Sequence, residues 1–206
     1  MKKFSNIFLF LLVFSIFPNG AVAEPTSPFY IKGLNLFNVD SKADASDVEF
    51  AENNGWSIIG GYRLNSLLSL ELGAVQYEPS VGIESDSMVM QRTEFDAQGF
   101  TLALQARTNY VELFDVWAAV GVFDWDADFR YDIRFSQFPG VVSTGFSSAS
   151  GQDLFINLGA AFPIIKDIDL VLEVGGSELT DFLDSGGGET IDIRQRYIGF
   201  GLEYRF

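Results

Sequence analysis

Alternation between apolar and polar residues is the feature of this sequence that most limits its fold. In the stretch "LLSLELGA", Leu68, Leu70 and Leu72 fall on one parity, and Ser69 and Glu71 fall on the other. A period of two residues predicts a β-strand, because successive side chains of a strand point to opposite faces. The pattern recurs without a convincing helical stripe and predicts strands at 28–39, 55–64, 67–74, 99–107, 114–123, 153–162, 169–176 and 197–206.

The connections between these predicted strands alternate in length. Short links are expected at 64–67, 107–113 and 163–169, and long ones at 39–54, 78–97, 124–150 and 177–191. This alternation predicts an up-and-down meander with one plain end and one elaborated end. The phase of the first strand is ambiguous, because Lys32 shares its parity with Leu34 and Leu36, and a β-bulge near Gly33 would reconcile them.

The length of each apolar run distinguishes a membrane barrel from a water-soluble sandwich. Each apolar face continues for about nine residues, which at about 3.4 Å per residue and a tilt of about 40° spans roughly 23–25 Å. Beyond that span the same face turns polar: the fifth strand meets Asp124, Asp126 and Asp128, where Trp125 and Phe129 are expected as interface aromatics. A free sheet edge in lipid would leave backbone groups unpaired. We therefore expect an all-β fold, an eight-stranded antiparallel up-and-down transmembrane β-barrel with short periplasmic turns and long extracellular loops.

The N-terminal residues predict export from the cytoplasm. "MKK" precedes the apolar run "IFLFLLVFSIF" and the small-residue sequence "AVA", an arrangement typical of a secretory signal peptide. Residues 1–23 are thus interpreted as the signal and 24–206 as the barrel domain. Without Lys2 and Lys3, 11 of the 13 basic residues face 28 acidic ones, a net charge of −17 that disfavours nucleic acid as a partner.

The chain resembles the small eight-stranded bacterial outer-membrane barrels of the OmpA transmembrane domain and OmpX type. The signal peptide, the hairpin "GGYRLNSLLSLELG" and the terminal "GLEYRF" carry this resemblance. It implies an outer-membrane location with both termini on the periplasmic side, and a final strand that the barrel-assembly machinery reads during insertion. The residues that fit this C-terminal signal are Ile198, Phe200, Leu202, Tyr204 and Phe206. No peptidoglycan-binding domain is expected after the barrel.

Catalysis is disfavoured by the absence of histidine. Ser–His and Asp–His arrangements are impossible, and the resemblance implies that the enzymatic barrels of this membrane, such as lipid A deacylases and phospholipases, need a catalytic histidine. Asp124, Asp126 and Asp128 depart from the calcium-loop template, since Phe129 and Phe135 stand where Gly and Glu are required. The sequence therefore predicts no catalytic residue, no cofactor and no metal site.

Charged residues on the inward parity point to a network inside the barrel. Its predicted members are Arg63, Glu71, Arg107, Glu173, Glu203 and Arg205, with the arginines as partners for Glu71 and Glu173. Eight strands leave an interior that side chains can fill.

We expect a monomeric barrel with a structural or surface-interaction role and a lumen plugged by these ion pairs. The alternatives are a narrow porin-like channel for ions or small solutes and, disfavoured, a lipid-modifying enzyme. The expected partners are outer-membrane lipid and lipopolysaccharide, which divalent cations would bridge to the acidic loops, and an unknown extracellular ligand stays open.

Overall fold

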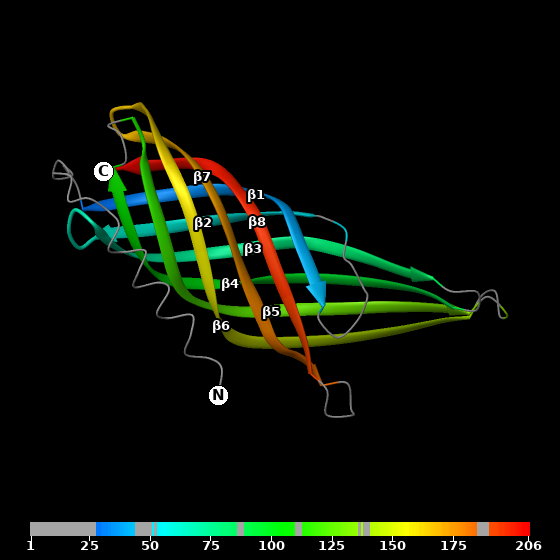
Figure 1. The fold of residues 1–206 in the computed structure, drawn as a ribbon. Coiled ribbons are helices and arrows are strands. Elements are labelled where there is room, and N and C mark those ends of the chain that lie inside the picture. Colours follow the sequence, from blue (N-terminus) through cyan, green and yellow to red (C-terminus); the bar gives the residue numbers. More distant parts are fainter. Residues whose placement is uncertain are drawn as a thin grey trace.

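The computed structural model describes residues 28–43, 51, 53–85, 89–109, 113–135, 137, 141–184 and 190–206, and these form a closed, eight-stranded antiparallel barrel (Figure 1). Each strand pairs with its neighbours in the chain, and the last strand pairs with the first. The strands are β1 (Phe29–Ala43), β2 (Asn53–Arg63), β3 (Leu68–Ser85), β4 (Val89–Asn109), β5 (Asp115–Phe135), β6 (Val142–Ile165), β7 (Ile168–Asp184) and β8 (Thr190–Arg205). Among these described residues, no helix is long and apolar enough to cross a membrane. The predicted signal peptide lies outside them.

The strands are strongly staggered around the ring. A path that starts at Tyr30 of β1 and moves from each residue to its partner on the next strand returns to β1 at Ser41. The register therefore climbs by eleven residues around the ring, from position 30 to position 41. This climb includes a register shift in β1 between Phe37 and Asp40. Stagger of this kind requires the strands to tilt, and it brings residues that are distant in sequence to one level of the interior.

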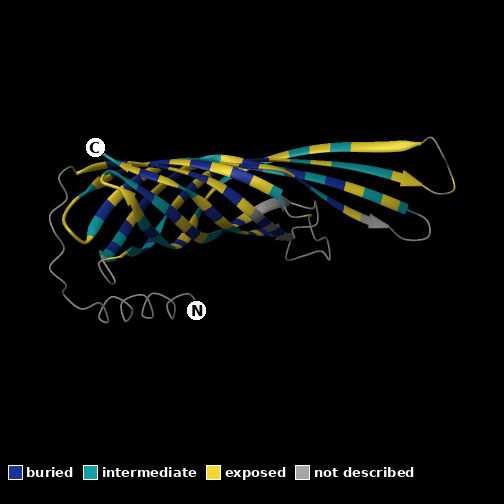
Figure 2. Ribbon diagram, turned by 90° about the horizontal axis from the view of Figure 1, so that it is seen from above, coloured by how far each residue is buried: buried dark blue, intermediate teal, exposed yellow. Residues whose placement is uncertain are grey.

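Within the barrel, exposed and buried residues alternate along the strands, as Figure 2 shows in yellow and dark blue; the outer half of β6 is exposed or intermediate. The apolar residues are the exposed ones: Leu72, Phe100 and Leu154 have 63%, 65% and 70% of their surface accessible, whereas Glu71 and Glu173 are only 4% and 2% exposed. Charged side chains inside and apolar side chains outside are the reverse of the distribution in a water-soluble barrel. The predicted orientation of the strands is confirmed for β2 to β8.

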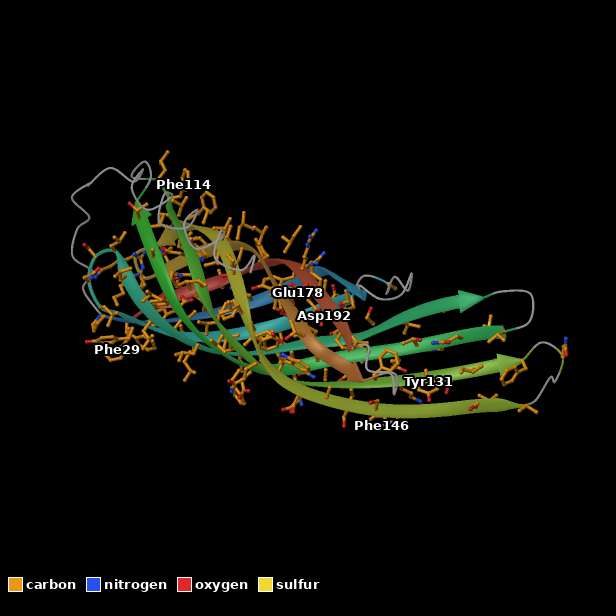
Figure 3. All side chains as sticks on the ribbon, turned by 60° about the horizontal axis from the view of Figure 1, so that its bottom comes forward. Phe29, Phe114, Tyr131, Phe146, Glu178 and Asp192 are labelled. Atoms are coloured by element: carbon orange, nitrogen blue, oxygen red, sulfur yellow. The ribbon has the colours of Figure 1, made fainter. Side chains whose placement is uncertain are left out.

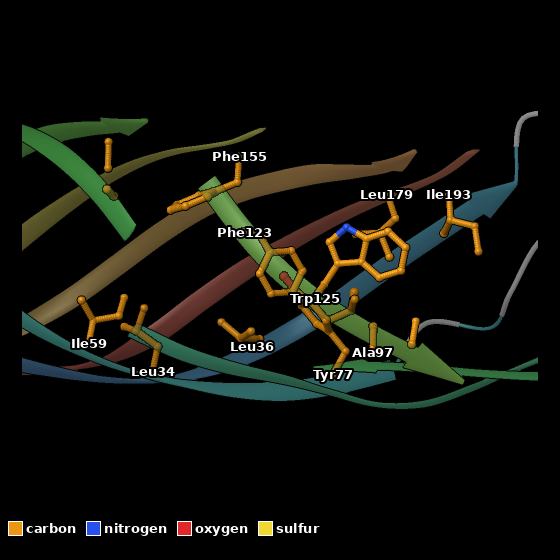
Figure 4. Packing of buried hydrophobic residues seen from close by; sticks show 14 of the residues in the cluster. Leu34, Leu36, Ile59, Tyr77, Ala97, Phe123, Trp125, Phe155, Leu179 and Ile193 are labelled. Carbon is orange, nitrogen blue, oxygen red and sulfur yellow. The ribbon is translucent and has the colours of Figure 1, made fainter. Parts of the chain in front are cut away.

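The expectation for β1 needs a correction. No bulge occurs at Gly33, and Lys32, Leu34 and Leu36 all point into the barrel, with exposures of 0%, 4% and 1%. The irregularity lies further along, between Leu36 and Val39. The two leucines are accepted inside because the interior at their level is itself apolar, formed by residues such as Ile59 and Tyr77 (Figure 4).

The predicted long loops are largely strands, which is a second correction. The ranges 78–97 and 124–150 were expected as loops, but β3 continues to Ser85, β4 starts at Val89, β5 reaches Phe135 and β6 starts at Val142. These four strands extend beyond the rest of the barrel as one sheet, with Tyr131 and Phe146 on it in Figure 3. Only the lipid-facing apolar pattern ends at the membrane boundary. The backbone ladder continues, since hydrogen bonding between strands does not depend on lipid.

Large aromatic side chains on the inner face cover glycines of the neighbouring strand. Trp117 lies opposite Gly159, Trp125 opposite Gly151 and Tyr131 opposite Gly145, all between β5 and β6. A Cβ atom added at Gly159 would come within 2.2 Å of the Trp117 ring. The glycine therefore leaves space against which the aromatic ring packs. Glycine–aromatic pairs of this kind help to fix the register between neighbouring strands.

We expect Gly159→Ala to destabilise the barrel by about 1–3 kcal/mol, because the Trp117 indole would have to leave its packed position and the new Cβ would also meet the backbone oxygen of Leu172 at 2.7 Å. Gly33→Ala is the matched control, since a Cβ at Gly33 meets no atom within 4 Å. Urea unfolding in lipid bilayers measures both. Equal stability of the two variants would contradict this account of the glycine–aromatic pairs.

Candidate functional site

Nine charged side chains fill the lumen from its centre to the end with the short turns. We call this set the lumen charge cluster; its members are Lys32, Arg63, Glu71, Arg107, Asp115, Asp169, Glu173, Glu203 and Arg205. They come from seven of the eight strands, β6 being the exception, and strand tilt brings them together. The described residues therefore place a continuous ionic layer across the interior.

Arg107 is the hub of the part nearest the short turns. Its guanidinium nitrogens lie 2.8 Å from Asp115 Oδ2, 2.6 Å from Glu203 Oε1 and 3.1 Å from Asp169 Oδ2. Arg205 Nη2 donates to the other oxygen of Asp169 at 2.7 Å, and Arg63 Nη2 lies 3.5 Å from Glu203 Oε1. The contacts of 2.6–2.8 Å among these are charge-assisted hydrogen bonds of the stronger kind.

Lys32 occupies the central part of the cluster. Its Nζ lies 2.7 Å from Glu71 Oε1, an ion pair in which both side chains are almost completely buried. The same carboxylate oxygen accepts hydrogen bonds from the Tyr30 hydroxyl at 2.6 Å and from Gln105 Nε2 at 2.9 Å. Glu71 is thus compensated by one cation and two neutral donors, as a buried carboxylate requires.

Trp117 separates the two parts. Its ring lies 5.1 Å from Lys32 Nζ and 5.7 Å from Arg107 Cζ, so the indole has a cation near it in each part. Cation–π attraction is strengthened where water is excluded. The ring therefore fills space between the two parts of the cluster and also helps to hold its two main cations.

Aromatic residues close the interior on the side of the long sheet. Tyr77 meets Phe123 edge to face at 6.3 Å between ring centres, and Trp125 is 2% exposed (Figure 4). Trp125 Nε1 donates to Asp153 Oδ2 at 2.8 Å, and the carboxylate of Asp153 also accepts hydrogen bonds from the backbone and hydroxyl of Thr180. This fixes Trp125 inside the barrel and corrects the expectation that it is an interface aromatic. The expectation fails because the side chain follows the inward parity of β5.

One cavity within the described interior is small. A cavity of about 20 Å³ is bordered by polar groups of Ser57, Thr101, Asn157 and Ser177 and by aromatic rings of Tyr77 and Phe155. A cavity of this size holds about one water molecule. Among the described residues, no cluster of three or more potential ligands could hold a metal ion.

All six residues predicted for the lumen network face the interior, but their pairing differs from the expectation. Arg63 and Arg107 pair with Glu203, and Arg205 pairs with Asp169, so none of the three arginines is the partner of Glu71 or Glu173. Lys32 is instead the cation nearest to both Glu71 and Glu173. The reason is the stagger of the strands, which sets the level of each side chain along the barrel axis and which alternation does not reveal.

Sequence reasoning missed Lys32, Asp115 and Asp169. Asp115 shares its parity with Trp117, and Asp169 shares its parity with Glu173, so consistent use of parity finds both. Lys32 was obscured by its apolar neighbours of the same parity. A lysine in the middle of a membrane strand is the signal that assigns it to the interior, because lipid exposure of Lys near the bilayer midplane costs about 2–4 kcal/mol.

The predicted assembly residues lie on the opposite face. Ile198, Phe200, Leu202, Tyr204 and Phe206 are exposed to the surroundings by 43–63% of their surface. The last backbone N–H, that of Phe206, donates to Phe29 O and joins the end of β8 to β1. Their role as an insertion signal stays a prediction. Asp124, Asp126 and Asp128 are exposed on the outer face of β5, and half of the predicted acidic loop, residues 44–50 and 52 of 39–54, lies outside the described residues.

Comparison with known proteins agrees with this architecture. Residues 7–206 match the family model described as outer membrane protein beta-barrel domain. The chain belongs to this family. No curated protein matches the sequence.

Solved structures of the same fold share little sequence with this outer-membrane barrel. The outer membrane protein OprG from Pseudomonas aeruginosa is 14% identical with a TM-score of 0.54, covering 91% of this chain and 99% of that one. Neisserial surface protein A is 14% identical with a TM-score of 0.51, covering 87% and 98%. The attachment invasion locus protein Ail of Yersinia pestis is 12% identical with a TM-score of 0.50, covering 87% and 100%. At this identity the likeness extends to the fold alone.

We expect Lys32→Met to cost about 3–5 kcal/mol of unfolding free energy, because Glu71 would stay buried without its cation. The matched control is Arg194→Met, whose pair with Glu178 at 3.3 Å is 43% and 47% exposed, so the loss there should be about 1 kcal/mol or less. Equilibrium unfolding in bilayers measures both. Similar losses in the two variants would show that burial does not govern these pairs.

Proposed function

We propose that this protein is a non-catalytic, non-conducting outer-membrane barrel with a structural or surface-interaction role. The observation that carries the proposal is the filled interior. The lumen charge cluster, Trp117 and the aromatic residues beyond it occupy successive levels, and the cavity described above has room for about one water. Steady passage of hydrated ions needs a continuous water path, and interior packing of this kind supports a non-conducting barrel.

The extended sheet of β3 to β6 supports the surface-interaction part of the proposal. Its strands reach well past the shorter β1 and β2 (Figure 1). On its outer face, Asp96 lies directly opposite Asp128, next to Asp126. Burial, together with the charges of Asp128 and Glu94, raises the pKa of Asp96. An acidic surface of this kind favours cationic groups, including divalent cations that bridge to lipopolysaccharide phosphates, over nucleic acid.

The orientation follows from the same proposal. The long sheet would project outside the cell, the short turns at 64–67 and 166–167 would face the periplasm, and the apolar belt would contact outer-membrane lipid. The assembly machinery would read the outward-facing residues of β8 during insertion. A monomer suffices for this role, since the barrel is closed by the chain's own strands.

Conductance in planar bilayers tests the central proposal against its alternative, a narrow channel. We expect no steady openings from the wild-type protein. Trp117→Ala removes the ring between the two halves of the cluster and should produce openings where the wild type gives none, which controls for insertion into the bilayer. Steady wild-type openings would overturn the proposal and favour the porin-like alternative.

Cysteine labelling tests the orientation, because the chain contains no natural cysteine. Ser148 lies on the extended sheet and Asn65 lies in a short turn, and both are exposed. A membrane-impermeant maleimide added to intact cells should label Ser148→Cys and leave Asn65→Cys unlabelled until the outer membrane is permeabilised. The reverse pattern would invert the proposed orientation.

A further inference from the structure

Glu173 differs from the other four carboxylates of the lumen charge cluster. Each of the others has a cationic nitrogen within 2.6–2.8 Å: Lys32 for Glu71, Arg107 for Glu203 and Asp115, and Arg205 for Asp169. The cation nearest Glu173 is Lys32 Nζ, 3.9 Å from Oε2, and it already pairs with Glu71 at 2.7 Å. Glu173 therefore has no cation of its own within the described part of the chain.

The charges of the cluster do not balance if all its members are ionised. Four cations, Lys32, Arg63, Arg107 and Arg205, face five carboxylates. The ionisable groups around Glu173 come from three strands: Lys32 from β1, Glu71 and Tyr77 from β3, and Tyr197 from β8. Only Lys32 among these is positive. An excess negative charge at this level would be buried without compensation, which is costly.

The hydrogen bonds around Tyr197 also require one more hydrogen. Its hydroxyl lies 2.9 Å from Glu173 Oε1 and 2.9 Å from Asn157 Oδ1, and both of these oxygens are acceptors if Glu173 is ionised. A hydroxyl has a single hydrogen to donate. In addition, no hydrogen bond of normal geometry reaches Glu173 Oε2 among the described residues, and the side chain is 2% exposed. The Trp117 indole N–H interacts with this carboxylate but carries no positive charge.

We propose that Glu173 is a proton-binding site that holds one proton at neutral pH in the folded barrel. Glu173 Oε1–H then donates to the Tyr197 oxygen, and the Tyr197 hydroxyl donates to Asn157 Oδ1. The proton comes from bulk water as the barrel folds, and four carboxylates then balance four cations. Reversing the Asn157 amide would satisfy Tyr197 without this proton, but it would leave the charge excess. Oε2 would then be an unpartnered oxygen of an ionised carboxylate, which is costlier to bury than the same oxygen in a neutral carboxyl group.

Stability of matched variants tests the assignment. Glu173→Gln keeps the shape of a neutral carboxyl group and a hydrogen donor, so we expect its folded-to-unfolded ratio in bilayers to stay within about twofold of wild type. Glu71→Gln removes an ionised partner of Lys32 and should lower that ratio by about 100-fold or more. A loss for Glu173→Gln as large as that for Glu71→Gln would overturn the proposal.

Infrared spectroscopy of the wild-type protein tests it independently of any change in stability. At neutral pH, the barrel in bilayers should show the carbonyl stretch of a protonated carboxyl group, and this band should be missing from Glu173→Gln and present in the surface control Glu178→Gln. Absence of the band from wild type would show that Glu173 is ionised, and a band of unchanged intensity in Glu173→Gln would assign it to another carboxyl group. Either result would reject the proposal.

Discussion

Pairing of backbone hydrogen-bond groups in hydrocarbon is the constraint on which the rest of this structure depends. Lipid offers no partner for a free N–H or C=O, so the sheet has to close, and the contact between β8 and β1 completes the ring. Closure with eight strands leaves a narrow interior. The problem for this sequence is then how to fill that space with side chains that alternate with lipid-facing ones.

The filling has a layered order. Arg107 organises the level nearest the short turns, Trp117 covers Gly159 and lies between two cations, and Lys32 organises the central level. Aromatic rings such as Phe123 and Trp125 follow towards the long sheet. Charges separated from water in this way depend on near-complete pairing. The side chains that fill the lumen and the nearly balanced charge cluster are therefore two aspects of one packing solution.

Much of the fold and part of the candidate site could be predicted from the sequence. Period-two alternation assigns Glu71, Arg107 and Glu203 to the interior and Leu72 and Phe100 to the lipid, since facing follows directly from parity. The ends of the strands could not be predicted, because the apolar pattern marks the membrane and not the end of the hydrogen-bonded ladder. Alternation also could not predict which way Lys32 points, because lysine and leucine side chains lie on the same, inward face of β1.

What the sequence by itself determined is local: the strands, their inward and outward faces, and a belt whose length matches a membrane. Only the tertiary structure decided which charges meet. The eleven-residue climb around the ring sets the height of each side chain, so Lys32 reaches Glu71, Arg107 reaches Glu203, and Glu173 is left without a close cation. Alternation carries the direction of a side chain but not its height along the barrel axis, because height depends on the stagger summed over all eight strands.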